Sequence, residues 1–239
     1  MSGPDTHLYR SRLDASLPEV RERIAIAAGR GGRDPESVRV VAVTKEHGVE
    51  AIEAALEAGI ADLGENRVER IEKWVGELGP EVARWHMIGH LQRRKAGRTR
   101  EVSTLLHSLD SVRLGERLEE VATEGDAPFP VLVQVNTSGE ATKGGFSPDE
   151  FWAGLERLLQ LPTLRVEGLM TMAPFTQDEK VIRRTFSTLR ALHGEAGDRL
   201  PAYEGTELSM GMSNDFEIAV EEGSTMVRLG TILLGERRG

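Results

Sequence analysis

The stretch Val38-Arg-Val-Val-Ala-Val-Thr-Lys45 is a run of β-branched and apolar residues that ends in a lysine. A short apolar run of this kind predicts a strand buried on both faces, as in a parallel sheet. The lysine then lies at the carboxyl end of the first strand, so Lys45 is the first candidate for chemistry.

Seven further runs of this type alternate with longer segments of helical period. This alternation predicts parallel strands joined by crossover helices. The eight predicted strands are 38–43, 60–63, 85–88, 105–109, 131–135, 164–170, 207–210 and 226–229. No segment is long enough to act as a linker, so the sequence predicts an α/β fold, a single (β/α)8 TIM barrel over residues 1–239.

The helix starts are marked by capping residues. Ser147-Pro-Asp-Glu150 and Ser16-Leu-Pro-Glu19 both carry a capping box with a proline near the start. The second box predicts an extra N-terminal helix that begins at Ser16, ends within 29–32 and covers part of the barrel. Its apolar side consists of Val20, Ile24 and Ala27. The other predicted helices are 49–58, 112–122, 148–159 and 179–193.

The composition argues against several classes of protein. The formal net charge is -9, and the acidic residues are spread along the chain, so no basic face is offered to nucleic acid or anionic lipid. The chain has no cysteine, which rules out disulfides and thiolate metal sites and suits a reducing compartment. No signal-like start and no apolar run near the roughly 20 residues of a membrane span are present. We expect a soluble, cytoplasmic protein.

Two turns near the end of the chain suggest a phosphate site. Ser213 precedes a segment that is typical of a helix start, where a hydroxyl cap and free N–H groups would face an anion. Gly230 and Thr231 follow the eighth strand, and the loops after strands seven and eight of a barrel often hold phosphate. The alternative is that Ser213 only caps a helix and Gly230 only forms a tight turn.

Two cationic residues are expected at the same end of the barrel. Lys45 should project into the mouth, where a free amine can form a Schiff base; the alternative is a solvated lysine. Arg228 lies two residues before Gly230, so it is expected to point inward and donate to a ring nitrogen near the phosphate. Its alternative is a buried ion pair with Glu167 or Glu207.

Three further groups of residues near strand ends are weaker candidates for a functional role. Asn66, in Gly64-Glu-Asn-Arg67, is either an amide donor at the mouth or part of an ordinary turn. His86 and His90 straddle a strand end without a third ligand, so we expect no metal site. Met170, Met172, Met210 and Met212 are expected to pack in the core and the mouth.

Seven segments, taken in order, resemble the pyridoxal phosphate homeostasis proteins, a family that looks like the barrel of alanine racemase standing alone. One departure is Arg93-Arg94, where that family usually carries small or amide residues, and we expect a solvated helix start there. The segments are Val41-Ala-Val-Thr-Lys45, Gly64-Glu-Asn66, Trp85-His-Met-Ile-Gly-His-Leu-Gln92, His107-Ser-Leu-Asp110, Gly168-Leu-Met-Thr-Met172, Leu208-Ser-Met-Gly-Met-Ser213 and Ser224-Thr-Met-Val-Arg-Leu-Gly-Thr231.

The resemblance implies a fold-type III barrel that binds pyridoxal 5′-phosphate (PLP) through a Schiff base on Lys45. It implies that Ser213, Gly230 and Thr231 hold the phosphate. By similarity to the racemase, it also implies that Arg228 hydrogen-bonds the pyridine nitrogen. The full set of cofactor-binding residues carried over is Lys45, Asn66, Met210, Gly211, Ser213, Arg228, Gly230 and Thr231.

The resemblance also implies a role: a monomer that binds, buffers and delivers PLP to apo-enzymes, with little or no turnover. Racemases of this type take one acid–base group from a further β domain, which we expect the segment Gly235-Glu-Arg-Arg-Gly239 cannot supply. Arginine at the pyridine nitrogen also weakens the electron sink of the cofactor. Two alternatives stay open: a racemase-like enzyme with Lys45 as base, and a barrel that binds another phosphorylated metabolite through Ser213 and Gly230.

Overall fold

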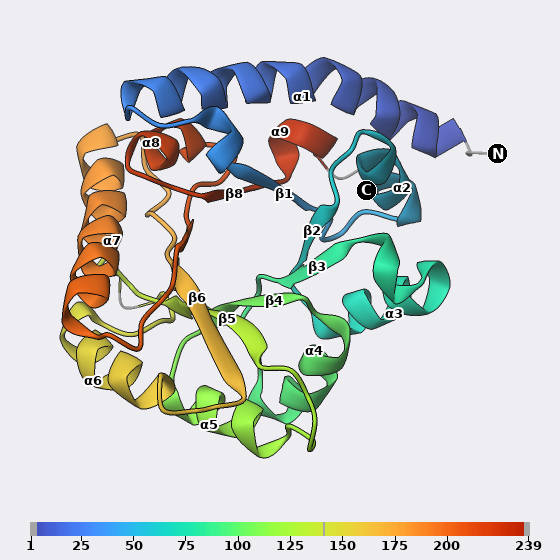
Figure 1. Ribbon diagram of the computed structural model, residues 1–239. Helices are drawn as coiled ribbons and strands as arrows, with labels where there is room; N and C mark the ends of the chain where they lie inside the picture. The colour runs from blue at the N-terminus through green and yellow to red at the C-terminus, as the bar shows by residue number, and fades with distance from the viewer. Residues whose placement is uncertain (1–3, 141, 237–239) are drawn as a thin grey trace.

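Eight parallel strands form a closed barrel in the computed structural model, which describes residues 4–140 and 142–236 (Figure 1). Each strand pairs with the next along the chain, and β8 pairs with β1, which leaves no free sheet edge. The predicted (β/α)8 barrel is therefore confirmed; the extreme ends of the predicted 1–239 domain lie outside the described residues. The strands are β1 (Arg39–Val43), β2 (Asp62–Glu65), β3 (Arg84–Met87), β4 (Leu105–Leu109), β5 (Phe129–Gln134), β6 (Leu164–Met170), β7 (Glu207–Ser209) and β8 (Met226–Leu229).

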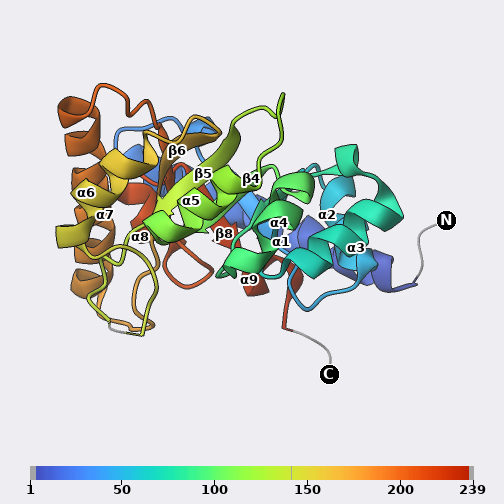
Figure 2. The ribbon, with the colours of Figure 1, turned by 90° about the horizontal axis from the view of Figure 1, so that it is seen from below.

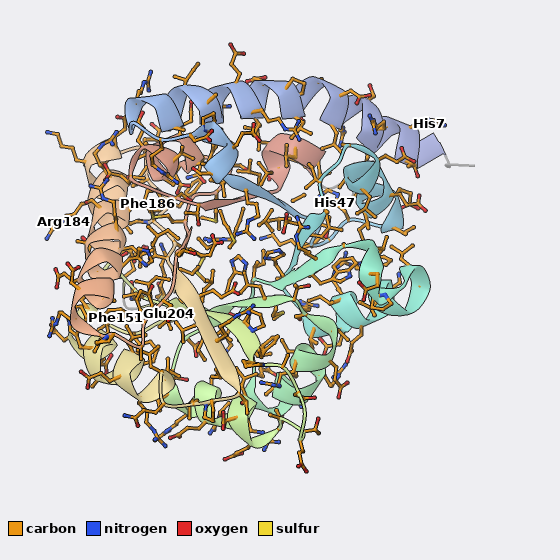
Figure 3. All side chains as sticks on the ribbon, viewed as in Figure 1. His7, His47, Phe151, Arg184, Phe186 and Glu204 are labelled. Carbon is orange, nitrogen blue, oxygen red and sulfur yellow. The ribbon has the colours of Figure 1, made fainter. Side chains whose placement is uncertain are left out.

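Helices surround this barrel, as the views along and across it show (Figures 1 and 2). At α6, the Ser147 hydroxyl and the Glu150 carboxylate make both bonds of the predicted capping box. On α7, Phe186 points toward the barrel and Arg184 away from it (Figure 3). The helices are α1 (Pro4–Arg30), α2 (Val49–Glu57), α3 (Val68–Leu78), α4 (Ala96–Val102), α5 (Val112–Glu120), α6 (Pro148–Leu158), α7 (Glu179–Arg199), α8 (Phe216–Glu221) and α9 (Thr231–Leu234).

Helix α1 differs from the prediction at its start. It begins at Pro4, so the predicted start at Ser16 is wrong, and Pro18 lies inside the helix. An interior proline costs about 3 kcal/mol, which the burial of one helix side offsets. The Ser16 hydroxyl donates to the Leu233 carbonyl (3.3 Å) instead of capping the helix. Helix α1 packs against α2, α8 and α9. Its buried side includes the three predicted residues and consists of Leu13, Leu17, Val20, Ile24, Ala27 and Ala28.

The strands separate two apolar regions because successive side chains point to opposite faces. Outward side chains pack under the helices, whereas a smaller cluster fills the barrel interior. Further along three strands the inward positions become polar at His107, Gln134 and Arg228, each two residues after an apolar member of the inner cluster. The inner cluster is Val41, Leu105, Leu132, Met170 and Met226.

Of the helices in the described residues, none combines the length and the apolar character of a bilayer-spanning segment.

Candidate functional site

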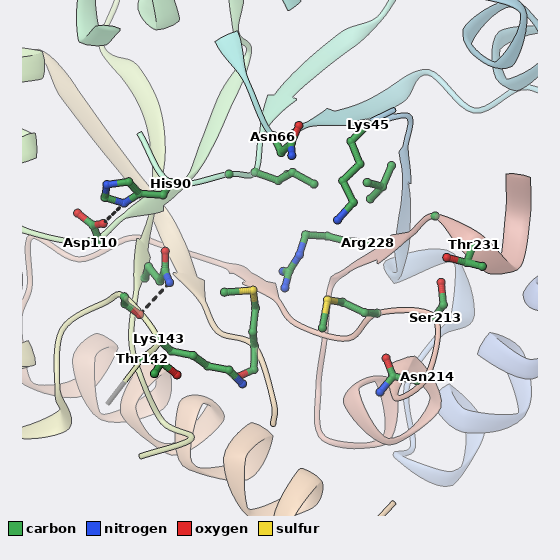
Figure 4. A pocket seen from close by; sticks show the side chains of 18 residues that line it. Lys45, Asn66, His90, Asp110, Thr142, Lys143, Ser213, Asn214, Arg228 and Thr231 are labelled. Carbon is green, nitrogen blue, oxygen red and sulfur yellow. Dashed lines mark hydrogen bonds and ion pairs between the residues drawn. The ribbon is translucent and has the colours of Figure 1, made fainter. Parts of the chain in front are cut away.

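A pocket of about 680 Å³ opens at the carboxyl ends of the strands (Figure 4). Its wall brings together six of the eight residues proposed to bind the cofactor, which come from four strand ends far apart in the sequence. These six are Lys45, Asn66, Ser213, Arg228, Gly230 and Thr231. The remaining lining residues are Val43, Ile88, Gly89, His90, Asp110, Gln134, Thr142, Lys143, Gly144, Met172, Met212 and Asn214.

Lys45 lies in a tight turn directly after β1. Its side chain is exposed and faces the pocket, and it has no hydrogen-bond or ion-pair partner within the described part of the chain. The next residue, Glu46, has φ 70°, which is unfavourable for a residue with a side chain. Surrounding contacts must therefore hold this turn in place.

A buried carboxylate that the sequence analysis did not single out supplies those contacts. Glu65 is fully buried and accepts hydrogen bonds from Thr44 Oγ1 (2.8 Å) and Arg70 Nε (2.7 Å). Trp74 Nε1 donates to the same carboxylate (3.3 Å). Arg70 Nη2 also donates to the carbonyls of Thr44 (3.2 Å) and His47 (2.6 Å), on either side of the lysine. The backbone of the turn is thus clamped while the lysine side chain stays unattached.

Asn66 reaches the pocket at the end of β2, where it is half-buried. Its backbone packs closely against Gly89, which follows β3. A Cβ at position 89 would lie 2.3 Å from the Asn66 carbonyl oxygen, so a side chain there would displace Asn66. The glycine therefore fixes the position of the neighbouring loop.

The loops after β7 and β8 meet at the Ser213 hydroxyl, which accepts a hydrogen bond from the Ile232 N–H (3.4 Å). The predicted cap at Ser213 is wrong: α8 begins at Phe216, because Asp215 folds back and accepts from the Met212 N–H (2.6 Å). Within the described residues, the backbone N–H groups at 213, 214 and 231 have no hydrogen-bond acceptor. These two loops therefore present several donors to the pocket, an arrangement suited to an anion.

Arg228 points inward from β8 and is only 5% exposed. It donates from Nη1 to Ser209 Oγ (2.5 Å) and from Nη2 to the Thr171 carbonyl (3.0 Å). The alternative ion pair is not formed, since Glu167 pairs with Arg165 and Glu207 with Arg39. Burial lowers the pKa of Arg228 to about 10, against the opposing effect of the Asp215 charge. The guanidinium is charged at neutral pH, and its remaining N–H groups are available to the pocket.

Met210 and Gly211 lie behind the pocket and do not line it. Met210 is fully buried in the outer core, since it follows the inward-facing Ser209 by one residue. Gly211 has φ 97°, and a Cβ there would lie 2.6 Å from the Ala219 Cβ, so this glycine allows α8 to pack closely.

The opposite wall carries polar residues to which the sequence analysis assigned no role. His90 Nδ1 lies 2.8 Å from Asp110 Oδ2, and Gln134 donates to the Gly144 carbonyl (2.8 Å) (Figure 4). Lys143 donates to the Ala173 carbonyl (2.6 Å) and pairs with a glutamate, so its amine is engaged. Asp110 and Gln134 could have been predicted to line the pocket, because both lie at the carboxyl ends of strands.

The histidines considered for a metal do not converge. His86 is buried against Asp62, whereas His90 lies at the pocket rim. Among residues 4–140 and 142–236, no group of three or more potential ligands is placed to hold a metal ion. Arg93 and Arg94 begin a short exposed 3-10 turn and do not line the pocket, as expected for a solvated start.

A closed parallel barrel with a lysine after β1 and donor-bearing loops after β7 and β8 is the arrangement expected for the barrel of the alanine racemase N-terminal domain. The family described as "Alanine racemase, N-terminal domain" matches residues 16–238. The chain is 38% identical over 222 residues to the pyridoxal phosphate homeostasis protein of Aquifex aeolicus, covering 93% of this chain and 97% of that protein. It belongs to the pyridoxal phosphate homeostasis protein family.

Solved structures agree with this assignment. An unknown protein from Bifidobacterium adolescentis superposes with a TM-score of 0.87 and 34% identity, covering 95% of this chain and 96% of that chain. PipY of Synechococcus elongatus, solved with PLP bound, superposes with a TM-score of 0.77 and 35% identity, covering 90% of this chain and 100% of that chain.

Proposed function

We propose that this protein binds PLP in the pocket at the barrel mouth and acts in PLP homeostasis. The observation that carries the proposal is the joint placement of an unattached amine, a buried guanidinium and two donor-bearing loops around one pocket. These groups match an aldehyde, a ring nitrogen and a phosphate. The pocket volume of about 680 Å³ lies in the range of small-cofactor sites.

Each group has a separate role in the proposal. The Lys45 amine would hold the aldehyde carbon of PLP covalently, with the aldehyde oxygen leaving as water, and the clamped turn keeps this amine at the pocket wall. Ser213, Gly230 and Thr231 hold the phosphate through hydroxyl and backbone donors. Asn66 lines the wall near Lys45, and Met210 and Gly211 support the phosphate loop from behind.

Arg228 weakens the electron sink that bound PLP supplies. Bound PLP stabilises carbanions best when its ring nitrogen is protonated. With a pKa of about 10, the Arg228 guanidinium keeps its protons at neutral pH and offers the nitrogen only a hydrogen bond. Relatives are named as homeostasis proteins, and on this ground, together with the weakened sink, we propose little or no turnover.

The exposed lysine suits reversible binding. Water and competing amines can reach Lys45 at the open mouth. We propose that the protein buffers free PLP and passes it to apo-enzymes, that it acts as a monomer, and that it does so in the cytoplasm.

Titration with PLP and with pyridoxine 5′-phosphate, which has no aldehyde, tests this function. We expect a visible absorption band only with PLP, lost in both Lys45→Ala and Lys45→Arg and kept in the exposed-surface control Lys180→Ala. Stabilisation by pyridoxine or sugar phosphates without any PLP band would favour a different phosphorylated ligand. A Lys45-dependent loss of optical purity in single-enantiomer amino acids would favour the racemase-like alternative.

Delivery is tested separately by mixing the PLP-loaded protein with an apo-enzyme. Activation of the apo-enzyme faster than by the same concentration of free PLP supports delivery. Activation at the rate set by released PLP supports buffering alone.

A further inference from the structure

A continuous line of polar side chains crosses the barrel interior and ends at the pocket. Asp62 Oδ1 lies 2.9 Å from His86 Nε2, and His86 Nδ1 lies 2.8 Å from His107 Nε2. His107 Nδ1 lies 2.9 Å from Ser209 Oγ, which accepts the bond from Arg228 Nη1. The five residues come from five different strands, and none is more than 5% exposed.

The hydrogen bonds of this line all run in one direction. Arg228 can only donate to Ser209, so the Ser209 proton needs an acceptor of its own. Within the described residues, His107 Nδ1 is the acceptor in reach. His107 then carries its proton on Nε2 and donates to His86 Nδ1, and His86 donates from Nε2 to Asp62. The opposite direction would leave the buried Ser209 proton without an acceptor.

The two ends of the line carry opposite charges. Arg84 donates to both oxygens of Asp62 (2.8 and 2.5 Å). Burial raises the pKa of Asp62, but the hydrogen bonds from His86 and Arg84 outweigh it and hold the pKa far below its usual range. Burial is the main cause that keeps the pKa of His107 well below 6.5, as the neutral ring requires. The line therefore connects a fixed anion to the buried cation.

The line of hydrogen bonds links the buried charge of Arg228 to a carboxylate that does not contact it. Within residues 4–140 and 142–236, its two hydrogen-bond partners are a hydroxyl and a carbonyl, and no carboxylate contacts it directly. Hydrogen bonds arranged in a chain polarise one another, so a carboxylate at the far end makes Ser209 Oγ a stronger acceptor. The guanidinium is thereby fixed in orientation, with its free N–H groups toward the pocket.

We propose that Asp62, His86, His107 and Ser209 are positioning residues, a directed relay that holds the charged Arg228 guanidinium against the ring nitrogen of bound PLP. The inference rests on the proposed function for the ligand, while the relay itself belongs to the ligand-free protein. A purely structural role would predict effects on stability alone.

A matched pair at His107 tests the relay. Leucine cannot bridge Ser209 and His86, whereas the amide of glutamine can accept from the first and donate to the second. We expect His107→Leu to weaken PLP binding roughly tenfold or more and to shift the absorption band of bound PLP, and His107→Gln to restore both. Folded His107→Leu protein with the wild-type band and affinity would overturn the proposal, as would a folded glutamine variant that behaves like leucine.

Nitrogen-15 NMR of the ligand-free protein tests the relay without PLP. We expect both His86 and His107 to carry a single proton on Nε2, and the Arg228 guanidinium signals to be slowly exchanging in wild type and His107→Gln but not in His107→Leu. A proton on Nδ1 of either ring, or unchanged guanidinium signals in the leucine variant, would contradict it. If His107→Leu does not fold, Ser209→Ala removes one hydroxyl and carries the same predictions. Wild-type protein that binds no PLP would sink the proposed function, while these ligand-free signals would still decide the relay.

Discussion

Lys45 and Arg228 face the same pocket from neighbouring strands but are held in different ways. Arg228 is buried inside the barrel, with two hydrogen bonds and a polar line behind it. Lys45 is exposed, and its amine has no partner in the described residues. The barrel thus fixes the group that we propose orients the ligand, and it leaves unattached the group that we propose bonds to the ligand and releases it.

The freedom of Lys45 is confined to its side chain. Glu65 and Arg70 clamp the backbone on both sides of it, and the turn accepts an unfavourable conformation at Glu46. Lys143 on the opposite wall shows the contrary case, since its amine is engaged by two backbone carbonyls.

Breaking the clamp should produce the largest effect. Glu65→Leu leaves Arg70 without its buried partner and frees the turn that carries Lys45. Removing one member of a fully buried ion pair costs about 3–5 kcal/mol. Because the Arg70 side chain is 26% exposed, we expect a loss up to the lower end of this range in the free energy of unfolding by urea. Glu69→Leu on the exposed side of α3 is the matched control and should change it little. Equal effects of the two substitutions would show that the clamp is unimportant.

The buried polar line behind Arg228 predicts that the stability of the protein depends on pH. His107 takes up a proton in the folded state only well below pH 6.5, whereas an unfolded histidine does so near 6.5. Below pH 6.5 the unfolded state therefore binds more protons than the folded state. As the pH is lowered through this range, the free energy of unfolding should decrease by up to about 1.4 kcal/mol per pH unit on account of this residue. Burial lowers the pKa of His47 and of His193 as well, which adds to the slope in the same direction.

Denaturant titrations between pH 7 and 5 measure this slope. His107→Gln should reduce the slope by up to the contribution of one proton, about 1.4 kcal/mol per pH unit. An unchanged slope in the glutamine variant would mean that His107 is protonated equally in both states.

The strained turn predicts the smallest effect. Glu46→Gly relieves the positive φ. We expect the free energy of unfolding to stay the same or to increase by about 1 kcal/mol or less, which the melting temperature would report. PLP binding should be kept, because Glu65 still holds the turn. A large loss of stability would mean that the Glu46 side chain is itself part of the clamp.

The sequence predicted what depends on local pattern. Three strands, 105–109, 164–170 and 226–229, have the predicted bounds, and the strand ends brought six proposed site residues into one pocket. The errors at Ser16 and Ser213 arose because both serines have a cap-like sequence but bond to distant groups near α9. Glu65 and His107 were missed as supporting residues. The partners of His107 lie on other strands, and those of Glu65 lie on α3 and in the turn after β1, so neither set follows from the pattern around the residue itself.

Borohydride reduction of the PLP complex, followed by mass-spectrometric mapping of the modified lysine, tests the central claim most directly. The two pocket lysines offer an internal comparison, since one amine is unattached and the other engaged. We predict the pyridoxyl group on Lys45 and not on Lys143. A label on Lys143 in place of Lys45, or no labelled lysine in the pocket, would contradict the account.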